Sequence, residues 1–79
     1  MKGIDTMTNI YEVVVNDGNV EHIHKIYGLE NAISFCIECG LCDNVVATHV
    51  MDTETGEIMW HMEYGIVVWV SGIGNPFEM

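Results

Sequence analysis

The fold is organised by residues 29–42, which read LENAISFCIECGLC. This is the one stretch of the chain with the apolar period of an amphipathic helix, at about 100° per residue. Its polar side chains (positions 30, 31, 34 and 38) fall on one side and leave a broad apolar face opposite. Gly40 is suited to a left-handed residue that ends the helix. The apolar face consists of Leu29, Ala32, Ile33, Cys36, Ile37 and Cys39, with Phe35 at its edge.

Two strand-like segments precede this helix. Residues 10–15 are rich in valine, and residues 20–27 follow the turn sequence NDGN at positions 16–19. Asp-Gly favours a two-residue hairpin loop, because glycine readily adopts the positive φ angles of such a turn. With that loop, Val15 would lie opposite Val20, and Val13 opposite His22. The face expected to carry the helix then holds Tyr11, Val13, Val15, His22 and His24.

Three further strands are expected after the helix, over residues 45–51, 58–64 and 66–70. The loop at 52–57 carries Gly56 in a left-handed position, and the pairing across it would set His49 opposite Trp60. The order β-β-α-β-β, followed by a fifth strand, predicts an α+β fold. In it an antiparallel sheet of four to five strands carries one helix on one face. Residues 1–8 have no period and form a loose lead-in, so that residues 9–79 make up a single domain.

One helix cannot cover both faces of such a sheet. The hydrophobic fraction is 49% in 79 residues, which is difficult to bury within one small chain. The opposite face and the wholly apolar last strand therefore predict a homodimer or a surface that binds a partner. The residues expected at that interface are Val46, Val50, Met59, Val68 and Val70.

Charge gives the clearest indication of partner class. Twelve Asp and Glu residues stand against two Lys and no Arg, for a formal net charge of −10. Without a basic patch the chain cannot collect phosphates, which excludes direct nucleic-acid binding. Such a surface attracts basic protein partners. The longest apolar run, residues 66–70, is far shorter than the roughly 20 residues of a membrane span, and no signal peptide is evident, so a cytoplasmic location is expected.

The three cysteines have the spacing Cys-x-x-Cys-x-x-Cys of iron–sulfur sites. No fourth cysteine exists, so a four-thiolate site cannot form within one chain. A zinc site remains open as an alternative, with Cys36, Cys39 and Cys42 joined by one imidazole, from His49, His22 or His24. The continuous helical period favours buried, structural cysteines without a cofactor. His22 and His24, two residues apart on one strand, could also bind a metal or pack against the opposite strand.

The chain shows no catalytic arrangement. No serine or cysteine has an evident partner base, and no glycine-rich phosphate loop joins a strand to a helix. The sequence therefore predicts that the protein is not an enzyme.

In its shortness, acidity and ββαββ order, the chain resembles small accessory proteins of phages and mobile elements, including anti-CRISPR-type inhibitors. The resemblance implies a non-catalytic inhibitor that occludes a basic nucleic-acid-binding site on a host protein. Carboxylates would then stand where nucleic-acid phosphates normally bind. The alternatives are a metal or redox protein built on the cysteines and a structural homodimer. The carboxylates that could make the contact are Glu12, Glu21, Asp52, Glu54, Glu57 and Glu63.

Overall fold

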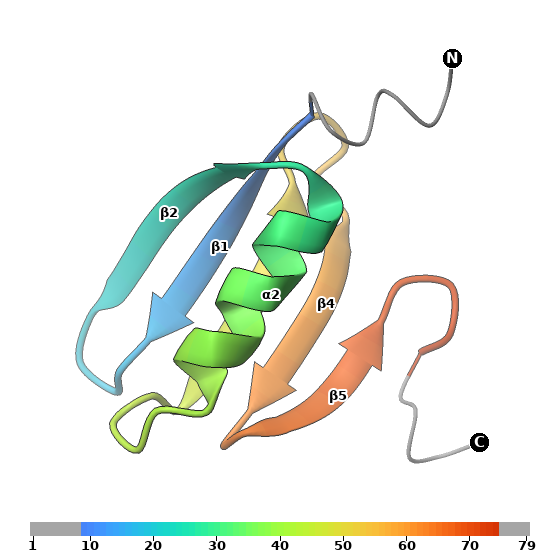
Figure 1. The fold of residues 1–79 in the computed structure, drawn as a ribbon. Helices are drawn as coiled ribbons and strands as arrows, with labels where there is room; N and C mark the ends of the chain where they lie inside the picture. Colours follow the sequence, from blue (N-terminus) through green and yellow to red (C-terminus); the bar gives the residue numbers. More distant parts are fainter. Residues whose placement is uncertain (1–8, 75–79) are drawn as a thin grey trace.

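A computed structural model describes residues 9–74 of the chain (Figure 1). The predicted lead-in, residues 1–8, and the end of the predicted domain, residues 75–79, lie outside this range. Five strands form one antiparallel sheet in the order β2-β1-β3-β4-β5. The predicted α+β fold is confirmed, including its fifth strand. The elements are β1 (Ile10–Asn16), β2 (Glu21–Tyr27), α2 (Leu29–Gly40), β3 (Ala47–Asp52), β4 (Ile58–Glu63) and β5 (Ile66–Val70).

Helix α2 lies obliquely across one face of the sheet (Figure 1). Because β2 and β3 both run antiparallel to β1, they are parallel to each other, and α2 is the crossover that such a connection needs. The helix packs mainly on β1 and β3, with fewer contacts to β2 and β4. No helix within residues 9–74 has the length and apolarity to cross a membrane. The buried cluster beneath α2 consists of Tyr11, Val13, Val15, Ala32, Cys36, Val45, Val50 and Met62.

Gly40 differs from its sequence prediction. It is the last residue of α2, and it is not among the glycines with positive φ. Glycine fits at this position because of its small size. A Cβ atom there would lie 3.1 Å from both the Met62 Sδ and the Thr48 Oγ1 atoms. The helix therefore meets the sheet at this point through a residue without a side chain.

The β1–β2 loop is longer than predicted. It holds four residues, 17–20, so that Val15 lies opposite His22 and Val13 opposite His24. The Asp17 Oδ1 atom accepts hydrogen bonds from the backbone N–H groups of Asn19 and Val20, each at 2.9 Å, which fixes the wider loop. The β1–β2 register differs from the predicted one by two residues. Because this number is even, every side chain of the two strands stays on its predicted face.

The β3–β4 pairing corrects a second prediction. A register shift between Val50 and Met51 sets His49 opposite His61 and Val50 opposite Trp60. The shift is a β-bulge, which sequence patterns do not mark. On its other side Val50 lies opposite Val13 of β1, so it faces α2 and is 0% exposed, and its placement at a dimer or partner interface is wrong.

The other four residues of that predicted interface are partly buried. Met59 packs against the core cluster. Val46, Val68 and Val70 are intermediate in exposure, and Val70 lies opposite Trp60 on the helix side of the sheet.

Candidate functional site

The face of the sheet opposite α2 is not covered by any element within residues 9–74. The strand register aligns one residue from each strand in a line across it. Val14 lies opposite both Ile23 and His49, His49 lies opposite His61, and His61 lies opposite Trp69. We call Ile23, Val14, His49, His61 and Trp69 the cross-strand row.

The two ends of the cross-strand row stand out from the surface. Ile23 is 58% exposed and Trp69 is 46% exposed, whereas Val14 in the middle is only 7% exposed. Ile66, on the same face, is 53% exposed. Large apolar side chains exposed on one uncovered sheet face make that face a candidate interaction surface.

The middle of the row consists of two stacked imidazoles. The rings of His49 and His61 lie 5.9 Å apart between centroids, with an interplanar angle of 12°. Burial lowers the pKa of His49, and the neighbouring His61 lowers it further, although Glu21 and Glu12 act in the opposite direction. The lowered pKa favours the neutral form of His49 at neutral pH.

Carboxylates surround the row. Glu12 lies on β1 opposite Lys25, and Glu21 and Glu63 lie on the same face at the ends of β2 and β4. The Glu63 Oε2 atom is 3.1 Å from the His61 Nε2 atom. Lys25 is the only Lys or Arg in residues 9–74. The uncovered face thus combines an apolar row with an acidic margin.

Two of the six predicted carboxylates are placed elsewhere. Asp52 lies opposite Tyr11, on the helix side of the sheet. Its Oδ1 atom accepts hydrogen bonds from the backbone N–H groups of Glu54 at 2.8 Å and Thr55 at 3.4 Å, so it shapes the β3–β4 loop. Glu54 is exposed within that loop.

A hollow of about 430 Å³ opens beside the Trp69 end of the row, lined by Glu57, Ile58, His61 and Trp69. The Trp69 Nε1–H group donates a hydrogen bond to the Ile58 carbonyl at 3.3 Å, which orients the indole. The Ser71 hydroxyl donates to the Glu57 carboxylate. Hydrogen bonds within the protein therefore position both Trp69 and Glu57, two of the residues that line the hollow. We call it the tryptophan hollow.

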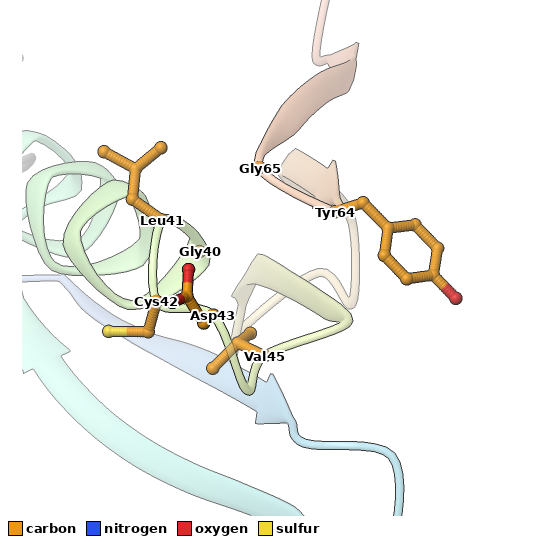
Figure 2. Close-up of a pocket in the computed structure, with 7 residues that line it drawn as sticks. All are labelled: Gly40, Leu41, Cys42, Asp43, Val45, Tyr64 and Gly65. Atoms are coloured by element: carbon orange, nitrogen blue, oxygen red, sulfur yellow. The ribbon is translucent and has the colours of Figure 1, made fainter.

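A second hollow of about 370 Å³ lies where the end of α2 meets the β4–β5 turn (Figure 2). Figure 2 shows the Tyr64 side chain pointing away from the other lining residues. The Cys42 thiol, which is exposed, donates to the Glu38 carbonyl at 3.6 Å. Its lining residues are Gly40, Leu41, Cys42, Asp43, Val45, Tyr64 and Gly65.

The predicted alternative zinc ligands are not brought together. Cys36 is buried between α2 and the sheet, where its Sγ atom lies 3.1 Å from the Thr48 Oγ1 atom. Burial raises the pKa of the Cys36 and Cys39 thiols, which favours the protonated form over the thiolate that a metal requires. His49 lies on the opposite face of the sheet. Within residues 9–74 no group of three or more His, Cys, Asp or Glu side chains is arranged to hold a metal ion.

The two histidines of β2 are used locally. His24 makes an edge-on contact with the Phe35 ring, with centroids 4.9 Å apart. The His22 Nε2 atom is 3.3 Å from the Asp17 Oδ2 atom. These two contacts are made with α2 and with the β1–β2 loop, not with the opposite strand.

Sequence reasoning missed the cross-strand row. Ile23 pairs with Val14 without a register shift, but the partners of His61 and Trp69 depend on two shifts, one between Val50 and Met51 and one between His61 and Met62. No local signal marks either shift, so only the folded sheet shows that these side chains share a line.

Comparisons of the chain with protein-family models, with curated proteins and with solved structures find no match. We therefore infer function from the chemistry of the uncovered face alone.

Proposed function

We propose that this chain is a non-catalytic binding protein, whose uncovered sheet face occludes a basic nucleic-acid-binding site on another protein. The observation that carries the proposal is the cross-strand row with its acidic margin. An apolar strip supplies contact area and the carboxylates supply selectivity for a basic partner. The resemblance to phage and mobile-element inhibitors agrees with this role.

The exposed apolar side chains and the negative charge each have a role in binding the partner. Ile23 and Trp69 are large and exposed, as anchors of an interface are in the free protein. The net charge of −10 speeds encounter with a basic surface and opposes binding of nucleic acid itself. The three cysteines are free thiols, which fits the reducing cytoplasm that we propose as the setting.

Affinity capture from bacterial lysates tests this function when it uses matched variants. The face variant Glu21→Gln/Ile23→Ser removes one charge and one apolar anchor from the uncovered face. The control Glu30→Gln/Ser34→Ala removes one charge from the solvent side of α2, where both side chains are exposed. We expect the native chain and the control to retain the same nucleic-acid-binding protein in 50 mM salt. The face variant should lose it.

A second readout tests occlusion directly. The captured protein, once purified, should release a labelled nucleic acid as the native chain is added, and high salt should weaken this competition because it screens the carboxylates. Equal capture by the face variant and the native chain would contradict the proposal, as would empty captures from several lysates. Sedimentation of the native chain would show in the same series whether a second copy covers this face instead.

A further inference from the structure

We infer that the tryptophan hollow receives an arginine side chain of the basic partner, with the guanidinium stacked on Trp69 and hydrogen-bonded to Glu57. The inference rests on the proposed function, which supplies a basic partner, and adds the residue type and the position at which it is recognised.

The residues that line the hollow are of types that bind cations. Its four lining residues are an aromatic residue (Trp69), an acidic residue (Glu57), Ile58 and His61. The volume of about 430 Å³ lies within the range of roughly 300–1,000 Å³ that is usual for small-ligand sites. An aromatic face beside a carboxylate attracts a cation through both the ring quadrupole and the charge.

The Trp69 indole and the Glu57 carboxylate are already held in position before a ligand binds. The indole is held by its hydrogen bond to the Ile58 carbonyl, and the Glu57 carboxylate by the Ser71 hydroxyl. A carboxylate accepts up to about four hydrogen bonds, so that Glu57 retains acceptor sites after binding Ser71. A cation that enters the hollow therefore need not order these side chains, and this lowers the entropic cost of binding.

The chemistry of the hollow favours arginine over lysine. The guanidinium is planar, stacks on aromatic rings and donates two parallel hydrogen bonds to a carboxylate, whereas the ammonium of lysine is compact and strongly hydrated. Within residues 9–74 the chain has no arginine and only Lys25, which lies on β2, at the opposite edge of the sheet. The full sequence contains no arginine, so an arginine in the hollow must come from another molecule.

The test uses two nine-residue peptides of equal charge, one alternating glycine with arginine and one alternating glycine with lysine. Binding to the full chain and its variants is followed in 20 mM salt by isothermal titration calorimetry, and the indole N–H resonance of Trp69 reports the position of the peptide in every protein that keeps this residue. We expect the arginine peptide to bind about fivefold more tightly than the lysine peptide. Glu57→Gln and Trp69→Leu should each remove most of this preference.

Two further variants separate recognition from general effects. Glu54→Gln makes the same charge change in the exposed β3–β4 loop and should weaken both peptides equally, leaving the preference intact. Ser71→Ala frees the Glu57 carboxylate without altering charge and should reduce the preference about twofold. Because Trp69→Leu could loosen β5, the Glu57 and Ser71 variants keep the inference testable in a chain with an intact sheet.

A preference for arginine that survives in Trp69→Leu and Glu57→Gln would overturn the inference, and so would the absence of any shift in the Trp69 resonance. Neither result would decide the proposed function, because that is tested separately at Glu21 and Ile23, at the other end of the row. Conversely, an arginine preference lost only in the hollow variants would establish the hollow even if no cellular partner were captured.

Discussion

At the scale of single residues, Tyr64 is in an unusual conformation. It has φ 53° at the β4–β5 turn, is followed by Gly65 at φ 80°, and is the one non-glycine residue with positive φ among residues 9–74. Two successive positive φ angles define a type I′ turn, in which Asn-Gly is strongly preferred. A tyrosine that is 77% exposed gains little packing there to offset the backbone cost.

Tyr64→Asn should therefore stabilise the fold by about 0.5–1 kcal/mol, since asparagine tolerates the left-handed region better than an aromatic residue. Chemical denaturation measures the change in the free energy of unfolding. Tyr64→Phe, which keeps the backbone strain, is the control and should leave that free energy unchanged. A destabilised Tyr64→Asn variant would mean that the tyrosine ring contributes packing to the turn.

His49 links the fold to pH. Its folded-state pKa lies below its ordinary value of 6.5 because burial and His61 disfavour the charged form. The unfolded chain thus binds more protons than the folded chain as the pH falls below about 6.5, so the free energy of unfolding should fall over that range. In His49→Gln this contribution is absent.

Urea denaturation at pH 7.5 and pH 5.0 tests this sign. The stability advantage of the native chain over His49→Gln should be smaller at pH 5.0, since Glu12, Glu21 and His61, which also face His49, are common to both proteins. An unchanged difference between the two proteins would assign the pH dependence to other groups.

At the scale of elements, the amphipathic period predicts α2 correctly because its signal is local. Glu30, Asn31, Ser34 and Glu38 are exposed, and Ala32 and Cys36 are buried, as expected. The faces of β1 and β2 are also correct, because the error in loop length is an even number of residues. The pairing of β3 with β4 depends on a bulge, whose cause is the fit between strands far apart in sequence, and there the sequence prediction fails.

Substitutions on the two faces of the sheet test whether Val50 faces α2. Val50→Ala should cost roughly 2–3 kcal/mol, because it removes two methyl groups from a fully buried site beneath α2. Ile23→Ala, on the uncovered face, should cost less than about 1 kcal/mol. Thermal unfolding of the two variants decides between the two orientations of β3, since the sequence prediction, with Val50 on the outer face, implies a small effect for Val50→Ala.

At the scale of the whole molecule, one helix and one five-stranded sheet leave a two-layer structure with one face uncovered (Figure 1). That asymmetry and the acidity can be predicted from element count and composition. The position of the site cannot, because the tryptophan hollow needs Glu57, His61, Trp69 and Ser71 to meet across β4 and β5 through a second register shift. Four of the six predicted carboxylates lie on or beside the uncovered face, since alternation along a strand is a local property.

The scarcity of basic residues has a practical consequence for measuring how the sheet opens. Trypsin cuts after lysine and arginine, and within residues 9–74 it has a single target, Lys25, in the middle of β2. This strand is at the edge of the sheet, with β1 as its one neighbouring strand. Cleavage at Lys25 requires β2 to detach, so the rate of digestion of the native protein reports the opening of that one strand. The described part of the chain thus contains a single-site probe of local unfolding, with no label added.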